Sequence, residues 1–235
     1  MVDTFYSNSL FCKTGFFPQC ERLDSQNIKC CKFGGSFPVL RGSEAPVCEI
    51  CGNQLELLLQ VYVPALPDTI LSLFPESKRE NLYTIFYCTD CMESNQNLVS
   101  FEYTPDDFDE LVFVRPKADS KVESSEFSMF EELLTYDDTS NSFHEAFSSC
   151  NMDGYEFETH MRQLRDSMPN GAKTFLGGMP RYEQGEQIPE GECVLLANIE
   201  DDCSFSMMWG DAGSAQLWMK LIDEQPKFIL IWESG

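Results

Sequence analysis

Four cysteines in two CxxC pairs are the residues of this chain best suited to metal chemistry. The pairs are Cys48 with Cys51 and Cys88 with Cys91. Four thiolates on two tight turns are the ligands that tetrahedral zinc takes in a closed structural site. Residues 52–87 separate the pairs, a longer spacing than the roughly 15–20 residues usual in ribbon motifs, so two separate reduced pairs are the alternative. We expect one structural zinc ion, bound by all four thiolates.

The other cysteines are interpreted as small hydrophobic residues of the core. The chain has 11 cysteines, and an odd number in a chain without a basic, then apolar, leader argues against a disulfide framework. We therefore expect a reducing, cytoplasmic or otherwise intracellular location, with Cys30 and Cys31 as spare candidate ligands for the metal. These cysteines are Cys12, Cys20, Cys30, Cys31, Cys150, Cys193 and Cys203.

The charge of the chain favours a basic protein as its partner. The sequence holds 39 acidic and 16 basic residues, a formal net charge of −23, and residues 101–166 are especially acidic. Nucleic acids and anionic membranes are poor partners, because both are bound by Lys and Arg. No apolar run approaches the ~18 residues of a membrane span. The alternative is that the acidity only keeps a chain with 19 Phe soluble.

Short strands are predicted beside both CxxC pairs. The apolar run 55–63 is typical of a buried strand, and residues 67–74 favour a short helix that begins at a proline. Residues 82–87 form a predicted strand that leads into the second CxxC pair, and residues 98–103 form another after it. Each pair therefore adjoins a strand, as in a zinc ribbon.

The order of motifs predicts an internal duplication. A Gly-Gly pair followed closely by a proline occurs at residues 34–38 and again at 177–180, and an apolar strand follows each, at 55–63 and 193–199. Alternating apolar residues predict two further strands, at 215–221 and 228–232. The predicted fold class is α+β and β-rich, with internally duplicated antiparallel sheets and a zinc-ribbon-like CxxC/CxxC insertion.

The chain divides into three predicted segments. Residues 1–103 form a first half with the CxxC pairs, and residues 171–235 form a second half. Residues 104–170 are acidic and rich in serine, and we interpret them as a linker with a local helix at residues 127–134.

A second candidate site is the loop around Trp209. Trp209, Gly210, Asp211 and Gly213 could shape a ligand pocket, because glycines allow close approach and the indole supplies a wall. The alternative is a glycine turn held by a core tryptophan. This loop would serve the alternative function of the chain, that of a hydrolase or small-ligand-binding protein.

Other catalytic or metal chemistry has weaker support in the sequence. Glu200, Asp201 and Asp202 could join Asp211 in holding a hard cation such as calcium, but they lack a recognisable loop spacing and are equally explained as solvated carboxylates. The two histidines, His144 and His160, both lie in the acidic middle of the chain. A Cys–His or Ser–His–Asp arrangement would depend on that segment.

These motifs resemble those of the YwqG-like family, a domain of unknown function. The resemblance rests on residues 32–38, 48–62, 86–91 and 177–180, and most distinctively on 207–213. It implies an α+β fold with duplicated β-rich halves and no established reaction; some members are proposed to be immunity proteins. The first half is also similar to programmed cell death protein 2 and its relatives, which implies chaperoning of a ribosomal protein. The C-terminal cysteines of that second family are absent here.

Together these observations predict a binding module rather than an enzyme. We expect an acidic, zinc-stabilised, non-enzymatic protein that engages a basic protein partner. Within that class it could be an immunity-type inhibitor, a chaperone-like binder or a component of an assembly.

Overall fold

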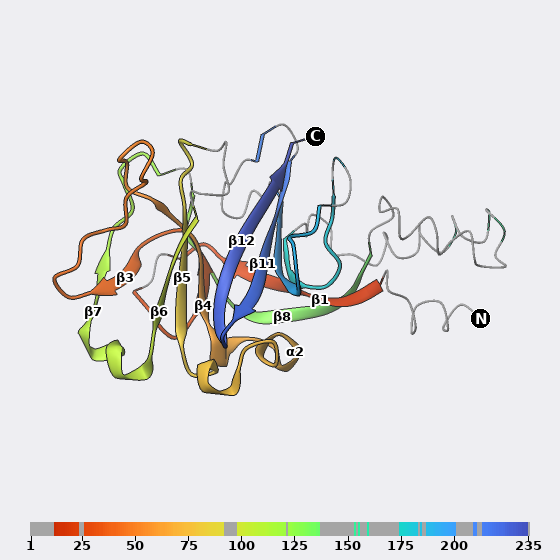
Figure 1. The fold of residues 1–235 in the computed structure, drawn as a ribbon, viewed down its shortest axis with the longest axis horizontal. Helices are drawn as coiled ribbons and strands as arrows, with labels where there is room; N and C mark the ends of the chain where they lie inside the picture. The colour runs from red at the N-terminus through yellow and green to blue at the C-terminus, as the bar shows by residue number, and fades with distance from the viewer. Residues whose placement is uncertain are drawn as a thin grey trace.

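The computed structural model is built almost entirely of antiparallel β-strands (Figure 1). One sheet has ten strands and a second has two. The predicted β-rich fold class is confirmed. The structure describes residues 12–23, 26–91, 98–120, 122–136, 153, 155, 159, 174–182, 184, 187–200, 209–210 and 213–234.

The large sheet has the strand order β12-β11-β10-β9-β1-β8-β2-β4-β5-β6, and the small sheet pairs β3 with β7. The strands are β1 (Cys12–Glu21), β2 (Cys31–Phe33), β3 (Phe37–Leu40), β4 (Glu56–Tyr62), β5 (Leu82–Tyr87), β6 (Leu98–Tyr103), β7 (Leu111–Val114), β8 (Ser125–Tyr136), β9 (Phe175–Gly177), β10 (Cys193–Glu200), β11 (Ser214–Ile222) and β12 (Gln225–Glu233).

Short helices lie between β4 and β7. They are η1 (Val63–Ala65), α2 (Asp68–Leu71), η2 (Glu76–Lys78) and η4 (Pro105–Glu110). Within the described ranges, none is long and apolar enough to cross a membrane. The predicted short helix after β4 is confirmed as α2.

The strand pairing of the first half is repeated in the second. In each half the strand before a Gly-Gly turn pairs with the next long strand, so that Lys32 lies opposite Gln60 and Phe175 opposite Asn198. The next two strands extend each half by antiparallel hairpins, β4-β5-β6 in the first and β10-β11-β12 in the second.

A β-bulge occurs at the corresponding position of both halves. Leu58 is the extra residue of β4, and Leu196 is the extra residue of β10. Each bulge lets two successive residues, Leu58 with Leu59 and Leu196 with Ala197, enter the same core. The shared register and the shared bulge confirm the internal duplication.

The first copy of the duplicated unit begins with β1, and the second begins with β8. The two copies exchange these first strands. β1 pairs with β8 and with β9, whereas β8 pairs with β1 and with β2. The first strand of each copy therefore lies beside the second strand of the other. As a result the two copies form one continuous sheet.

The prediction of a local helix at residues 127–134 is wrong, because these residues lie in β8. Pro18 pairs with Phe130 and Cys20 with Phe127, so β8 carries an extra residue opposite β1. The bulge brings the Phe127 and Phe130 rings together, with centroids 5.8 Å apart. Phe127 and Phe130, three positions apart, therefore lie on the same face of a strand, a spacing that is otherwise typical of a helix. The division of the chain at residues 103 and 170 stays a prediction, although β7 and β8, both within the predicted linker, belong to the sheets.

The large sheet folds back so that its two halves enclose the core. In Figure 1 β12 is drawn to the right of β5 and β6, and β12 contacts β6, so that aromatic pairs join the two halves there. Tyr83 meets Phe228 with ring centroids 5.6 Å apart, and Tyr87 meets Trp209 at 5.5 Å. The β3-β7 sheet covers the outer face of the first copy with its own apolar cluster. That cluster also contains Cys48 and Cys88.

We expect the Gly34→Ala variant to lower the free energy of unfolding by about 3 kcal/mol or more. Gly34 has a φ of +58°, and an added Cβ would lie 2.4 Å from the carbonyl oxygen of Glu123. The matched control is Gly42→Ala, because Gly42 also has a positive φ, +87°, but has no atom near the added Cβ. The control should cost only about 1 kcal/mol. If urea titrations gave equal losses of unfolding free energy for the two variants, close packing around Gly34 would not contribute to stability.

Candidate metal centre

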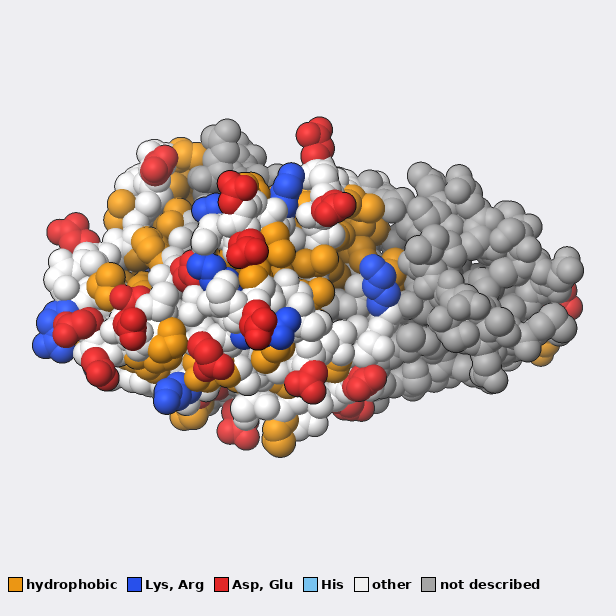
Figure 2. Space-filling model, turned by 60° about the horizontal axis from the view of Figure 1, so that its bottom comes forward, with side chains coloured by type: hydrophobic (Ala, Val, Ile, Leu, Met, Phe, Trp, Pro, Cys, Tyr) orange, Lys and Arg blue, Asp and Glu red, His pale blue; other side chains and the backbone are white. Residues whose placement is uncertain are grey.

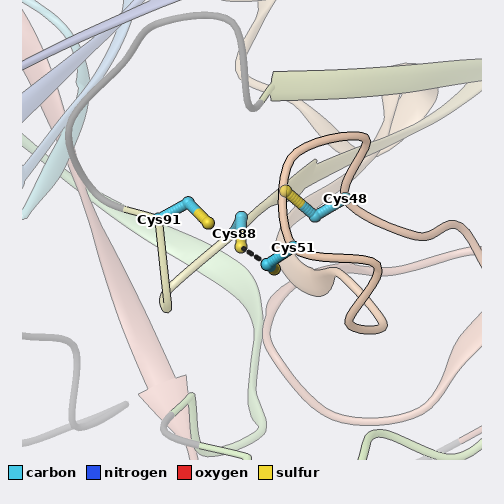
Figure 3. Close-up of side chains that lie close together, drawn as sticks. All are labelled: Cys48, Cys51, Cys88 and Cys91. Carbon is cyan, nitrogen blue, oxygen red and sulfur yellow. Dashed lines mark hydrogen bonds between the residues drawn. The ribbon is translucent and has the colours of Figure 1, made fainter.

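The four cysteines of the CxxC pairs lie together on two loops. Cys48 and Cys51 come from the loop between β3 and β4, and Cys88 and Cys91 come from the loop after β5 (Figure 3). Their sulfur atoms all lie within 4.8 Å of one another, and the Sγ atoms of Cys51 and Cys88 are 3.7 Å apart. The predicted convergence of the two pairs is therefore present.

The first loop is a tight turn held by backbone hydrogen bonds. The N–H of Cys48 donates to the carbonyl oxygen of Asn53 at 2.8 Å, and the N–H of Gly52 donates to that of Cys48 at 2.8 Å. Gly52 has a φ of +73°, which favours glycine. The turn leaves Cys48 buried and Cys51 exposed.

The backbone of this turn favours a thiolate at Cys48. Burial raises the pKa of Cys48, but hydrogen bonds from the backbone of Cys51 and Ile50 outweigh it and lower the pKa to about 7. The hydrogen bond with the Cys51 thiol, followed by burial, raises the pKa of Cys91 to about 12, and burial raises that of Cys88. The thiolate is the form of cysteine that binds a metal, so metal and protons compete at this cluster.

The residues present fit a tetrahedral metal ion. Metal–sulfur bonds of about 2.3 Å place the sulfur atoms of a tetrathiolate site about 3.8 Å apart. The Sγ atoms of Cys51 and Cys88 lie at about that separation, 3.7 Å, and all four sulfur atoms lie within 4.8 Å of one another. Among the described residues the cluster contains these four cysteines and no carboxylate or histidine. Four thiolates would fill every position of a tetrahedral ion and leave none open for a substrate.

A buried carboxylate, Glu56, fixes the second loop. Its side chain accepts hydrogen bonds from the hydroxyl groups of Thr89 at 2.6 Å and Ser120 at 2.7 Å, and from the N–H of Val122 at 3.0 Å. The ammonium group of Lys117 lies 3.3 Å from the same carboxylate. Because Thr89 directly follows Cys88, this network sets the path of the loop through the cysteines.

Asp90 links the two loops to each other. Its carboxylate accepts a hydrogen bond from the side-chain amide of Asn53 at 3.0 Å and forms an ion pair with Lys117 at 3.0 Å. Asn53 belongs to the first loop and Asp90 to the second. Neither Glu56 nor Asp90 was predicted to support the site, although an acidic residue inside the apolar run 55–63 was a usable signal.

Cys30 and Cys31 do not join the cluster. The Cys30 thiol donates to the carbonyl oxygen of Asn27 at 3.1 Å, and the Cys31 thiol lies 3.7 Å from the carbonyl oxygen of Tyr62. Both cysteines are buried, and burial raises the pKa of Cys31 to about 12. They are small core residues.

The described residues of the Trp209 loop are tightly packed. Trp209 is fully buried against Tyr87. A Cβ added at Gly213 would lie 2.1 Å from the carbonyl oxygen of Trp209, and one added at Gly210 would lie 2.8 Å from Ser234. Asp211 lies outside the described residues. A ligand-binding role for Trp209, Gly210, Asp211 and Gly213 stays a prediction.

Most of the other candidate residues lie outside the described part of the chain. Glu200 is buried and forms an ion pair with Arg181 at 2.8 Å. The candidates outside the described residues are His144, His160, Asp201 and Asp202.

One family model matches most of the chain. It covers residues 31–226, and its description is domain of unknown function (DUF1963). The curated proteins compared with the chain include no match.

We expect the Glu56→Gln variant to lose about 3 kcal/mol of stability at neutral pH, because a neutral amide is a weaker acceptor for the three hydrogen bonds and no longer offsets the charge of Lys117. The control is Glu110→Gln, which removes an exposed ion pair with Arg41 and should cost less than about 1 kcal/mol. Urea titrations of the two variants measure both losses.

The stability difference between the wild type and the Glu56→Gln variant should depend on pH. Burial raises the pKa of Glu56, but its hydrogen bonds from Thr89, Ser120 and Val122 and the charge of Lys117 outweigh burial and hold the pKa below its ordinary value of 4.5. A lowered pKa stabilises the fold above the ordinary value, and this contribution is lost as the pH falls through the lowered one. The stability gap between wild type and variant should therefore narrow in acid. A constant gap would contradict this assignment.

Proposed function

We propose that this chain, which belongs to the DUF1963 family of domains of unknown function, is a zinc-stabilised binding module for a basic protein. It acts without catalysis: the metal holds the fold, and acidic surface engages the partner. The observation that carries the proposal is the concentration of carboxylates at one end of the molecule, on short helices that leave them open to solvent.

The acidic end is formed by α2, η2 and η4. These helices gather at the end drawn at the bottom of Figure 1, and Figure 2 looks onto this end, where acidic side chains are spread over the described surface. The six residues of η4 include four carboxylates and no basic residue. Of the nearby basic groups, Lys78 is already paired with Glu102 at 2.9 Å. Such a surface attracts cationic partners and repels anionic ones.

The metal in this proposal is zinc. Four cysteines that converge from two turns favour zinc over harder ions, which prefer oxygen ligands. Bound there, zinc ties the loop after β5 to the loop before β4. The resemblance to YwqG-like proteins is compatible with such a role. An immunity-type inhibitor, a chaperone-like binder and an assembly component are three forms that binding of a basic client can take.

We expect the purified protein to contain one zinc ion per chain and the Cys88→Ser variant to contain at most a small fraction of it. The matched control is Cys193→Ser, because Cys193 is a partly buried cysteine outside the cluster and should leave the zinc content unchanged. Elemental analysis by mass spectrometry gives the stoichiometry. Metal removal by a chelator should lower the melting temperature of the wild type. Full zinc content in the Cys88 variant would refute the shared site.

The binding proposal predicts capture of a basic protein from the native cell lysate that weakens as salt rises. Neutralising the acidic end with Asp68→Asn, Asp106→Asn and Glu110→Gln should reduce the affinity for that protein about tenfold, since each exposed charge contributes roughly 0.5 kcal/mol. Titration of the captured protein against each variant measures the loss.

The matched control neutralises three exposed carboxylates outside these helices: Glu44→Gln, Glu49→Gln and Glu192→Gln. It has the same net charge and should lose less than about threefold. Equal losses of affinity in the two triple variants would show that the partner responds to the net charge of the protein and not to the acidic end. Failure to capture any basic protein would overturn the proposed function.

A further inference from the structure

A groove beside the acidic end combines aromatic walls with carboxylates. It has a volume of about 410 Å³ and lies where the turn before β2, the end of β4 and η4 come together. This is large enough for one long side chain and at the lower limit for a small-molecule pocket. The groove is separate from the cysteine cluster, and none of its lining residues belongs to the Trp209 loop.

The wall of the groove includes an aromatic pair. The rings of Tyr62 and Phe108 meet edge to face, with centroids 6.3 Å apart and planes inclined by 62°. Both side chains are only partly buried, and Pro105 lies beside them in the lining. Aromatic faces that are open to a groove attract cations through the negative potential above the ring.

Two carboxylates complete the lining. Glu80 and Asp109 are exposed, and neither forms an ion pair with another residue that the structure describes. Burial raises the pKa of Tyr62, and the charge of Glu80 raises it further, which places this carboxylate near the ring hydroxyl. A cation in the groove would therefore meet an aromatic wall and two negative charges.

One basic residue, Lys29, also lines the groove. Its side chain is exposed, and its backbone N–H is held by the side chain of Asn27 at 2.9 Å. An anionic occupant would use Lys29 but would be repelled by both carboxylates. A cationic occupant gains from the carboxylates and from the rings, so the balance of charges favours a cation.

We propose that this groove holds an arginine side chain of the basic protein partner, an inference that rests on the proposed function. Arginine fits better than lysine because a planar guanidinium group stacks on an aromatic ring while its N–H groups reach carboxylates on either side. The groove would thus select a basic partner by shape, in addition to the general attraction of the acidic end.

The test uses a fluorescein-labelled tetra-arginine peptide and the full-length protein at low salt, with binding measured by fluorescence anisotropy. The double variant Glu80→Gln/Asp109→Asn should weaken peptide binding about tenfold. The control double variant Glu44→Gln/Glu192→Gln has the same charge and should change it less than twofold. All the substituted residues are exposed, and melting temperatures equal to that of the wild type would show that the variants are folded.

Two further measurements sharpen the result. Lys29→Gln should strengthen binding of the peptide, since it removes a like charge, whereas a groove for anions would show the opposite. A tetra-citrulline peptide, which has nearly the same shape without the charge, should bind at least about tenfold more weakly than tetra-arginine. A tetra-lysine peptide should bind with an affinity between those of the tetra-arginine and tetra-citrulline peptides.

Equal weakening by the groove variant and the control variant would overturn the inference but leave the proposed function standing, because general attraction to the acidic surface would account for the binding. If tetra-arginine did not bind to the wild type, the inference that the groove holds arginine would also be overturned. The proposed function is judged separately, by salt-dependent capture of a basic protein.

Discussion

The antiparallel pairing of β1 with β8 is the constraint on which the rest of the structure depends. Four strands extend the sheet on each side of this pair, so the position of every other strand of the large sheet follows from its register. Thr135 holds the pair to its surroundings: its hydroxyl donates to the carbonyl oxygen of Lys13 at 2.8 Å and accepts from the N–H of Met179 at 2.7 Å. The second of these bonds joins the central pair to the Gly-Gly turn of the second copy.

The two copies share the same strand pairing but differ in what is added to it. Only the first copy is covered by the β3-β7 sheet, and only there do the described residues place a cluster of cysteines. In the loops that carry the cysteines, Cys48 and Cys88 belong to the apolar cluster of the β3-β7 sheet, but Ile50 and Cys51 are exposed, so apolar packing alone does not hold these loops. Their geometry instead depends on the hydrogen bonds and ion pairs of Glu56 and Asp90. A metal ion bound by the four thiolates would add a cross-link between the two loops to these contacts.

Local pattern was sufficient to predict the regular strands and the cysteine cluster. The apolar run 55–63 appears as β4, which is buried on both faces, and the alternation in residues 215–221 appears as β11, which has one face in the main core. It was insufficient for β8, where a bulge brings Phe127 and Phe130 onto one face and mimics helical spacing. It was also insufficient for Glu56 and for the groove at Tyr62, because their partners lie far apart in the sequence and only tertiary pairing brings them together.

The exchange of first strands has a consequence for how the chain is made. β1 ends at Glu21 and its partner β8 begins at Ser125, so a ribosome that adds about 5–20 residues per second needs on the order of ten seconds to supply the partner. All four cysteines of the cluster are synthesised before Ser125. During synthesis the cysteine loops are therefore complete while the edge of β1 is still unpaired, and an unpaired strand edge is a surface that other chains can join. The late synthesis of β8 makes this interval a period in which the nascent protein is open to aggregation.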